Sequence, residues 1–458
     1  MTARHESHVR AILGLGVPML VGAVAATMSG VIDIAMIGHY GARDVVAVAA
    51  ATTVFDIFAN VVLASIMGHQ ILSARFAGRD EPGGIRDSVR ATLGFSGGWA
   101  LGCALLCALV GGALTSLVSG EPGLAHIGGG FLLACSPTLL LLVPFTLCSA
   151  VINAYKRPRF TMIAAITVNL VNLGLNWLLI YGPGPFPRLG AVGSGLATTA
   201  SWAVGVVFLG VVAWRLHLVE KVRRAAPAPA ADFETSVPRL AWPAITSMTL
   251  DYMSTAVFFA ILGRVDANAL GGGRIAFQVM VVAYGVLGAF GSGSRVLVGR
   301  ALGAENSPEA HALWRTGQRL LAVFAVPVAV VLIGLPDAIG SLFTSFPQVR
   351  DEAGAAIRMV GVCLPLMALT LGNVSALRAL GKTRWDMYGN LLAAIGVQIP
   401  LGWLFAEVFD LGIAGAFGGV VGYWSARAVV SEVLARRAMR EAAPRRPAGA
   451  PTTLAATT

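Results

Sequence analysis

A single acidic residue lies in an apolar run near the start of the chain. The stretch VIDIAMIGHYG, residues 31–41, places Asp33 among apolar side chains, downstream of Pro18. An ionised carboxylate in a bilayer costs about 3 kcal/mol or more, so this group needs polar partners or water. A carboxyl that exchanges between charged and neutral forms suits proton coupling. The competing interpretation is a helix-end acid, because Gly38 and Gly41 follow, but the apolar IAMI after Asp33 disfavours it.

Three amides share a spacing that predicts one helix face. In TVNLVNLGLNW, residues 167–177, Asn169, Asn172 and Asn176 stand at positions i, i+3 and i+7. Amides are costly against lipid, so this face is expected to point into the protein, as a functional network or as interhelical hydrogen bonds. Thr198 and Thr199 are candidate hydroxyl partners from the next apolar run.

Further acids fall within other apolar runs. Asp56 in TTVFDIFANVV has Asn60 one helical turn later, and both are candidates to line a cavity. Asp251 follows Pro243 in a later run. It is either a group that attracts a cationic substrate or a structural acid satisfied by Ser247 or Thr255 on its own helix.

The composition requires elements that cross a membrane. Hydrophobic residues make up 56% of the 458 residues, charged residues only 12%, and the mean hydropathy is +0.75. Lipid offers no hydrogen-bond partners, so such runs span as helices of about 20 residues. The short alternating segments of a β-barrel do not appear in the sequence. We therefore predict an all-α membrane protein with twelve spans, at 11–38, 47–73, 91–119, 127–154, 161–182, 191–215, 239–263, 271–297, 318–343, 354–380, 386–407 and 413–435.

The basic residues predict the orientation. The net charge of +10 arises from Lys and Arg clusters between spans, which argues against a nucleic-acid partner. With both termini in the cytoplasm, only six of the 33 Lys and Arg residues lie on the other side: Arg43, Arg188, Arg264, Arg274, Arg350 and Arg358. We expect a multi-pass protein of the cell (plasma or inner) membrane. The sequence carries no P-loop, metal-ligand motif or nucleophile elbow, so no enzyme activity, metal or cofactor is predicted.

The chain repeats itself at a constant offset. Residues 225 apart match, including Pro18 with Pro243, Gly68 with Gly293, Arg75 with Arg300 and Gly78 with Gly303. We predict an N-terminal lobe at 1–215, a cytoplasmic linker at 216–238, a C-terminal lobe at 239–437 and a disordered cytoplasmic tail at 438–458. Six spans per lobe is an even number, so the two lobes share one orientation and are related by a pseudo-two-fold axis along the membrane normal.

Several stretches resemble one family. GVPMLVGAVAATMSGVIDIAMIGHYG (16–41), GHQILSARFAGR (68–79) and NVSALRALGKTRWDMYGN (373–390) are similar to helix 1, the end of helix 2 and the helix 10–11 junction of multidrug and toxic compound extrusion (MATE) transporters. VIDIAMIGHYG looks closest to the DinF-like branch. The resemblance covers about residues 8–437 and implies a cation-coupled exporter of organic compounds.

The family pattern maps onto some positions and departs at others. Helix 5 in the family carries an Asn and, four residues on, an Asp that shares the network of the helix-1 Asp; Asn172 matches the first, but Asn176 replaces the acid. Another branch carries a Glu on helix 7, near Asp251, and an Asp on helix 10, where this chain has no acid. Sodium coupling is therefore less expected than proton coupling. Gln278 lies where the family often places a cavity glutamine.

Together these features predict a secondary active antiporter that exports small organic, cationic or lipophilic compounds in exchange for protons by alternating access. Asp33 would exchange the proton within the amide network, and the first helix would bend at Pro18. We expect the protein to act as a monomer in the bilayer, with the small-molecule substrate and protons as its partners. The alternatives are a sodium-coupled drug exporter, a lipid-linked saccharide flippase of related architecture, or a membrane scaffold or channel without coupled transport.

Overall fold

The computed structural model describes residues 2–226, 236–344 and 346–442, and these residues form helices and turns with no β-strand among them. The first half contains α1 (Thr2–Gly38), α2 (Ala42–Ser65), α3 (Met67–Arg79), α4 (Pro82–Ser119), a 3₁₀ turn (Pro122–Leu124), α5 (Ala125–Cys135), α6 (Pro137–Ala154), α7 (Pro158–Tyr181) and α8 (Gly190–Arg215). The short α9 (Leu218–Arg224) leads to the second half. That half contains α10 (Val237–Val265), α11 (Ala267–Gly303), α12 (Ser307–Gly334), α13 (Pro336–Ser341), α14 (Pro347–Ala379), α15 (Thr383–Ala393), α16 (Ile399–Trp403) and α17 (Gly412–Glu441), with π-helical turns at Ala394–Gln398 and Leu404–Val408.

The predicted fold class is confirmed, with twelve candidate spans among the described residues. Some spans combine two helices: α2 continues into α3, and α5 into α6. Proline stands at the first turn of several helices, including α4, α7 and α14, where its missing N–H leaves no helical hydrogen bond unmade. Gly182 ends α7 in the left-handed conformation that favours glycine, which turns the chain back toward α8.

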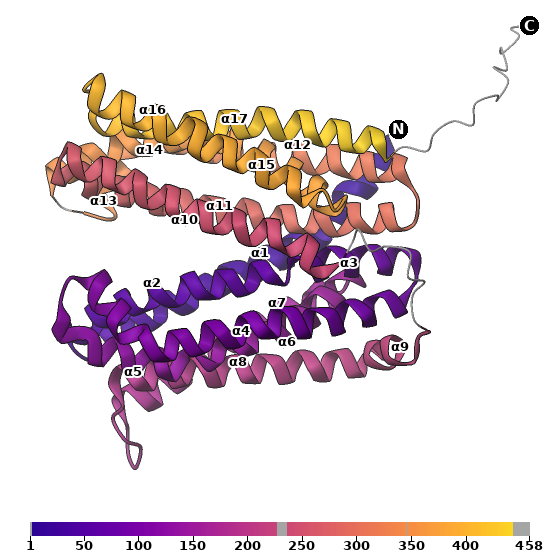
Figure 1. The fold of residues 1–458 in the computed structure, drawn as a ribbon, viewed down its shortest axis with the longest axis horizontal. Coiled ribbons are helices and arrows are strands. Elements are labelled where there is room, and N and C mark those ends of the chain that lie inside the picture. Colours follow the sequence, from indigo (N-terminus) through magenta and orange to yellow (C-terminus); the bar gives the residue numbers. More distant parts are fainter. Residues whose placement is uncertain (1, 227–235, 345, 443–458) are drawn as a thin grey trace, which may run out of the picture.

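The helices form two lobes that lie side by side (Figure 1). α1–α8 make one lobe and α10–α17 the other, each around its own apolar core. The linker contains α9, which is tied to the first lobe through a bond from Lys221 Nζ to Asp80 Oδ1 of 2.8 Å. This bond lowers the pKa of the exposed Asp80 carboxyl.

The boundaries differ slightly from those expected. α10 begins at Val237, inside the predicted linker at 216–238, and α17 continues to Glu441, past the expected end of the second lobe at 437. The first residues of the expected tail are thus helical, and residues 443–458 lie outside the described residues. α1 begins at Thr2, well before the apolar run that starts at residue 11.

The two lobes pack together toward the end of the molecule that carries α9, the start of α1 and the end of α17 (Figure 1). α1 and α3 contact α11, and α2 and α3 contact α10. In Figure 1 the ribbons of the lobes diverge toward the opposite end, where α5 and α13 lie. We call the first end the linker end and the second the distal end.

Candidate functional site

The carboxylate of Asp33 lies inside the first lobe, in contact with α7. Its side chain is only 7% exposed, and Oδ1 accepts a hydrogen bond of 2.5 Å from Asn176 Nδ2. Asn176 is completely buried. The apolar run that surrounds Asp33 forms part of α1, and α1 packs along α7, so the acid meets the predicted amide face.

Asn172 and Thr198 complete this network. The same Nδ2 of Asn176 donates to Asn172 Oδ1 at 3.1 Å, and Asn172 Nδ2 donates to the Thr198 hydroxyl at 3.4 Å. The Thr198 hydroxyl in turn lies 3.4 Å from Asp33 Oδ2 and 3.0 Å from the carbonyl oxygen of Ser194. A hydroxyl has one proton, so Thr198 donates to only one of these two oxygens at a time. We call Asp33, Asn172, Asn176 and Thr198 the carboxylate–amide network.

Of the three amides and two threonines that the sequence grouped with Asp33, Thr199 and Asn169 lie outside this network. Thr199 donates to the carbonyl oxygen of Ala134 at 2.8 Å and pairs with the Thr138 hydroxyl at 3.0 Å, so it joins α8 to α5 and α6. Asn169 donates to the carbonyl oxygen of Ala165 on its own helix. The i+7 spacing identified the face correctly, but the side-chain geometry separates its first member from the other two.

A cavity of about 730 Å³ opens beside the network in the first lobe. Asp33 and Thr198 line it, while the fully buried Asn172 and Asn176 stand behind them. The other described lining residues include aromatic side chains (Phe55, Phe131, Phe145 and Trp202), Asp56 and uncharged polar side chains such as Asn169, and none of them is Lys, Arg or His. Val281 of α11 closes one side, so the cavity extends to the boundary between the lobes.

Asp56 and Asn60 both line this cavity from α2. Asn60 Nδ2 donates to the hydroxyl of Tyr252 on α10 at 2.7 Å, which bridges the two lobes. The side chain of Asp56 is exposed to the cavity. The cavity therefore contains two carboxylates in different settings: Asp33 is held by an amide, and Asp56 faces open space.

Pro18 also lines the cavity and stands where α1 passes from one lobe to the other. Before it, Ile12 and Leu15 belong to the apolar cluster of the second lobe. After it, Gly22 faces α7 of the first lobe, with Ala165 Cβ 3.8 Å from an ideal Cβ position. Pro18 has no N–H to donate to the carbonyl oxygen of Gly14, so α1 lacks one helical hydrogen bond at this crossing.

Asp251 lies in a separate, smaller cavity of about 170 Å³ in the second lobe. Its carboxylate accepts a hydrogen bond of 2.9 Å from Asn390 Nδ2 of α15. Of the two interpretations offered for Asp251, the one that paired it with the hydroxyl of Ser247 or Thr255 does not match these contacts. The Thr255 hydroxyl donates to the backbone oxygen of Asp251, and the backbone oxygen of Ser247 accepts a bond from Asn390. The carboxylate of Asp251 is therefore bonded by a residue of another helix and not by a residue of its own helix.

A buried charge network continues from Asn390, and sequence reasoning missed it. Tyr423 donates to Asn390 Oδ1 at 2.8 Å and accepts from Arg427 at 2.5 Å, and Arg427 bonds Asp386 at 3.1 Å. Arg378 completes the cluster with a 2.8 Å ion pair to Asp386. The signal available in the sequence was Arg427, a basic residue inside the last apolar run.

Gln278 is not in either cavity. Its side chain is exposed on α11, and it is not among the described residues that line either cavity. The glutamine that reaches a cavity is Gln398, in the π-helical turn after α15, which accepts a 3.1 Å hydrogen bond from Ser254. π-Helical turns shift the register of a helix, so helical spacing did not identify this residue.

Comparisons with known proteins agree with this architecture. The MatE family model matches residues 18–178 and 243–404, one segment in each lobe. The chain is 24% identical over 426 residues to the probable multidrug resistance protein NorM of Thermotoga maritima, covering 90% of this chain and 88% of that protein. It is 26% identical over 437 residues to the corresponding protein of Geobacillus kaustophilus, covering 92% of each. Among solved structures, MATE in the bent conformation superposes with a TM-score of 0.85 at 16% identity, over 96% of this chain and 98% of that one.

Proposed function

Because the chain belongs to the MatE family, whose members are membrane transporters and not enzymes, we propose that it is an antiporter that exchanges protons for small organic compounds. It is a multi-pass membrane protein of the multidrug and toxin extrusion type.

The carboxylate–amide network is the observation that carries this proposal. An ionised carboxylate only accepts hydrogen bonds, and Asp33 accepts one from the Asn176 amide nitrogen. Asn176 Oδ1, by contrast, is buried and has no hydrogen-bond partner among the described residues. A protonated Asp33 has an O–H to donate, and a rotated Asn176 amide would offer Oδ1 to accept it. The same two side chains can thus bond in either protonation state, with different orientations.

Pro18 connects this change to the lobes. α1 is attached to the second lobe before Pro18 and carries Asp33 within the first lobe after it. A rearrangement around Asp33 would move the later part of α1, and the missing hydrogen bond at Pro18 lets the helix bend there at low cost. Because α1 lines the cavity, bending would reshape the space available to the substrate.

The lining favours lipophilic and cationic compounds. Aromatic side chains offer apolar contact area, and the cavity contains carboxylates but no basic group among its described lining residues. We assign Asp56 as the group that attracts a positively charged substrate, because it faces the cavity and lies apart from the amide network. Protons and substrate would then compete electrostatically for one lobe.

The orientation follows from the basic residues. α9, with Lys221, Arg223 and Arg224, lies at the linker end, and by the positive-inside rule we assign this end to the cytoplasm. The start of α1 lies at the same end (Figure 1). Because the lobes pack together there, we propose that this is an outward-facing state of a carrier in the cell membrane. One chain supplies both lobes and the cavity, which supports a monomer.

The experiment that tests proton coupling uses the protein in proteoliposomes. A pH gradient should drive transport of a fluorescent cationic dye by the wild type, and Asp33→Asn should abolish the dependence on the gradient because the amide cannot exchange a proton. Asp56→Asn should weaken dye transport while keeping its dependence on the gradient. If Asp33→Asn still responds to the pH gradient, the proton assignment fails; transport driven by a sodium gradient alone would indicate the sodium-coupled alternative.

A lipid-linked saccharide flippase is less well supported. Such a protein needs cationic groups to hold diphosphate, and the sequence suggested almost none within the spans. The structure corrects this in one respect, because Arg427 lines the smaller cavity. Its guanidinium is engaged by Asp386 and Tyr423, however, which reduces its availability to an anion.

A further inference from the structure

Residues that match in the internal sequence repeat also make equivalent contacts between the two lobes. At the linker end, α3 contacts α11, and contacts of one lobe with the other recur between the positions 225 residues away. In a two-fold arrangement, a contact from residue i to residue j is repeated from the equivalent of i to the equivalent of j. The arginine and glycine contacts between the two lobes of this protein follow this rule.

Two arginines cross between the lobes in equivalent ways. Arg75 Nε of α3 donates to the carbonyl oxygen of Ala379, the last residue of α14, at 2.9 Å. Arg300 of α11 donates to the carbonyl oxygen of Ala154, the last residue of α6. The two donor residues are 225 positions apart in the sequence, and so are the two acceptor residues. The last carbonyl groups of a helix carry partial negative charge and lack helical partners, so each arginine caps a helix of the opposite lobe.

Two glycines pack against the backbone of these arginines. A Cβ on Gly78 would overlap the carbonyl oxygen of Arg300, and a Cβ on Gly303 would overlap that of Arg75. These glycines are again equivalent positions of the two lobes. Any side chain at either position would hold the lobes apart, so close approach requires glycine at both.

A fifth contact lies at the centre of this arrangement. Arg295 Nη2 donates to Gln70 Oε1 at 3.1 Å, and these two residues are themselves equivalent positions 225 apart. A residue can contact its own equivalent only next to the symmetry axis. The Arg295–Gln70 bond therefore marks the axis, with the arginine caps and glycine contacts arranged around it.

We propose that these residues form a pseudo-symmetric latch that holds the lobes together at the linker end and that opens when the transporter faces inward. The latch consists of Arg75, Arg300, Gly78, Gly303 and the Arg295–Gln70 bond. Its bonds all join one lobe to the other, so they favour the closed linker end and are lost when the lobes separate there. The two equivalent halves contribute equally to this closure.

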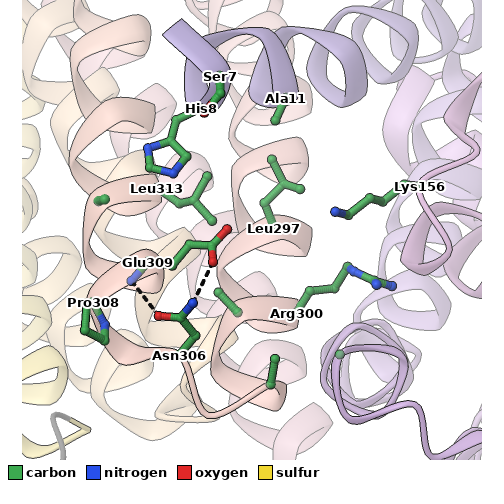
Figure 2. A pocket seen from close by; sticks show the side chains of 14 residues that line it. Ser7, His8, Ala11, Lys156, Leu297, Arg300, Asn306, Pro308, Glu309 and Leu313 are labelled. Carbon is green, nitrogen blue, oxygen red and sulfur yellow. Dashed lines mark hydrogen bonds between the residues drawn. The ribbon is translucent and has the colours of Figure 1, made fainter. Parts of the chain in front are cut away.

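The surroundings of Arg300 are suited to opening. A pocket of about 530 Å³ lies at this boundary between the lobes, and Gly78 is one of its lining residues. Arg300 and Lys156 line one side of it, and Asn306 and Glu309 line the other (Figure 2). Figure 2 shows the side chains of Arg300 and Lys156 next to each other at the pocket wall. An arginine beside such a pocket can exchange its carbonyl partner for water, which lowers the cost of opening the latch.

The test measures the separation of the lobes at the linker end. Spin labels are placed at Arg79→Cys and Ala304→Cys, which are equivalent positions, after the five native cysteines are replaced by alanine. Distances in nanodiscs are compared for the parent, Gly78→Ala and Gly303→Ala. The control variants are Gly97→Ala and Gly285→Ala, because a Cβ at either position meets no atom within 4 Å. The controls share the gain in helix propensity that accompanies glycine-to-alanine changes.

We expect Gly78→Ala and Gly303→Ala each to raise the ratio of long to short distances by about tenfold, with the controls unchanged. A shift in neither variant, or in only one of the two, would overturn the latch. Should either variant fail to fold, Arg75→Gln and Arg300→Gln test the same point, with the same expected lengthening. The inference rests on the antiporter function and the outward-facing state proposed above. The spin-label distances are measured without an ion gradient. They would therefore be unchanged if Asp33 proved not to be the proton-binding residue.

Discussion

At the scale of single residues, the network around Asp33 is defined by which atoms donate and which accept. Asn176 uses its amide nitrogen for both Asp33 and Asn172, which leaves its oxygen unpaired. An unpaired buried polar atom costs about 1–3 kcal/mol, so this state is strained unless another arrangement uses the oxygen. Protonation of Asp33 provides such an arrangement, which is why we place the coupling function at this pair.

Replacing Asn176 by leucine tests the pair from the amide side. Asn176→Leu removes the donor to Asp33 Oδ1 and the acceptor for its protonated form, so gradient-driven dye transport should fall by about tenfold or more. Asn169→Leu is the comparison change on the same helix face, at a side chain that also lines the cavity but donates to its own helix and not to Asp33. It should retain the response to the pH gradient. Equal responses of the two variants in proteoliposomes would argue for a general packing role of the amide face.

At the scale of elements, α1 is the helix that belongs to both lobes. Its first part packs into the second lobe and its later part carries the acid of the first lobe, with Pro18 between them. Helices kink most readily where a proline removes a hydrogen bond. The position of Pro18 at the crossing makes α1 the element that transmits a change at Asp33 to the lobe boundary.

Pro18→Ala should therefore stiffen α1. The alanine can donate its N–H to Gly14, which should raise the free energy of unfolding by up to about 3 kcal/mol and lower the rate of dye transport. Pro327→Ala, at an exposed proline within α12, gives the same helix chemistry away from the crossing. Initial transport rates and thermal unfolding of both variants provide the measurement. A wild-type rate in Pro18→Ala would exclude a hinge at this residue.

At the scale of the whole molecule, an even number of spans in each half gives both lobes the same orientation. Their contacts accordingly repeat around an axis along the membrane normal, and equivalent residues such as Gln70 and Arg295 meet there. The even number of spans in each half also places the start of α1, α9 and the end of α17 at one end of the molecule (Figure 1).

This arrangement predicts which loops are accessible from outside the cell. In the cysteine-free protein, Pro185→Cys, between α7 and α8, should react with a membrane-impermeant maleimide in intact cells. Glu220→Cys, on α9, should react only after the cells are permeabilised, because we assign the linker end to the cytoplasm. Both side chains are exposed, so accessibility from one side decides the result. Labelling of Glu220→Cys in intact cells would reverse the proposed orientation.

The sequence by itself determined the fold class, the twelve spans and the two-lobe repeat. These features depend on local hydropathy and on residue spacing, both of which are present in the linear chain. It also identified Asp33 with Asn172, Asn176 and Thr198, because helical spacing places amides on one face and intramembrane polar groups must find partners.

Only the tertiary structure decided which partners those groups find. Thr199 bonds Thr138 instead of Asp33, and Asp251 accepts a hydrogen bond from Asn390 of another helix. The glutamine that lines a cavity is Gln398, in a π-helical turn, and not the predicted Gln278. The repeat was visible in the sequence, but its equivalent arginines capping each other's helices were not. Contacts between helices depend on rotation and register, which are set by packing across the whole bundle and leave no local periodicity to detect.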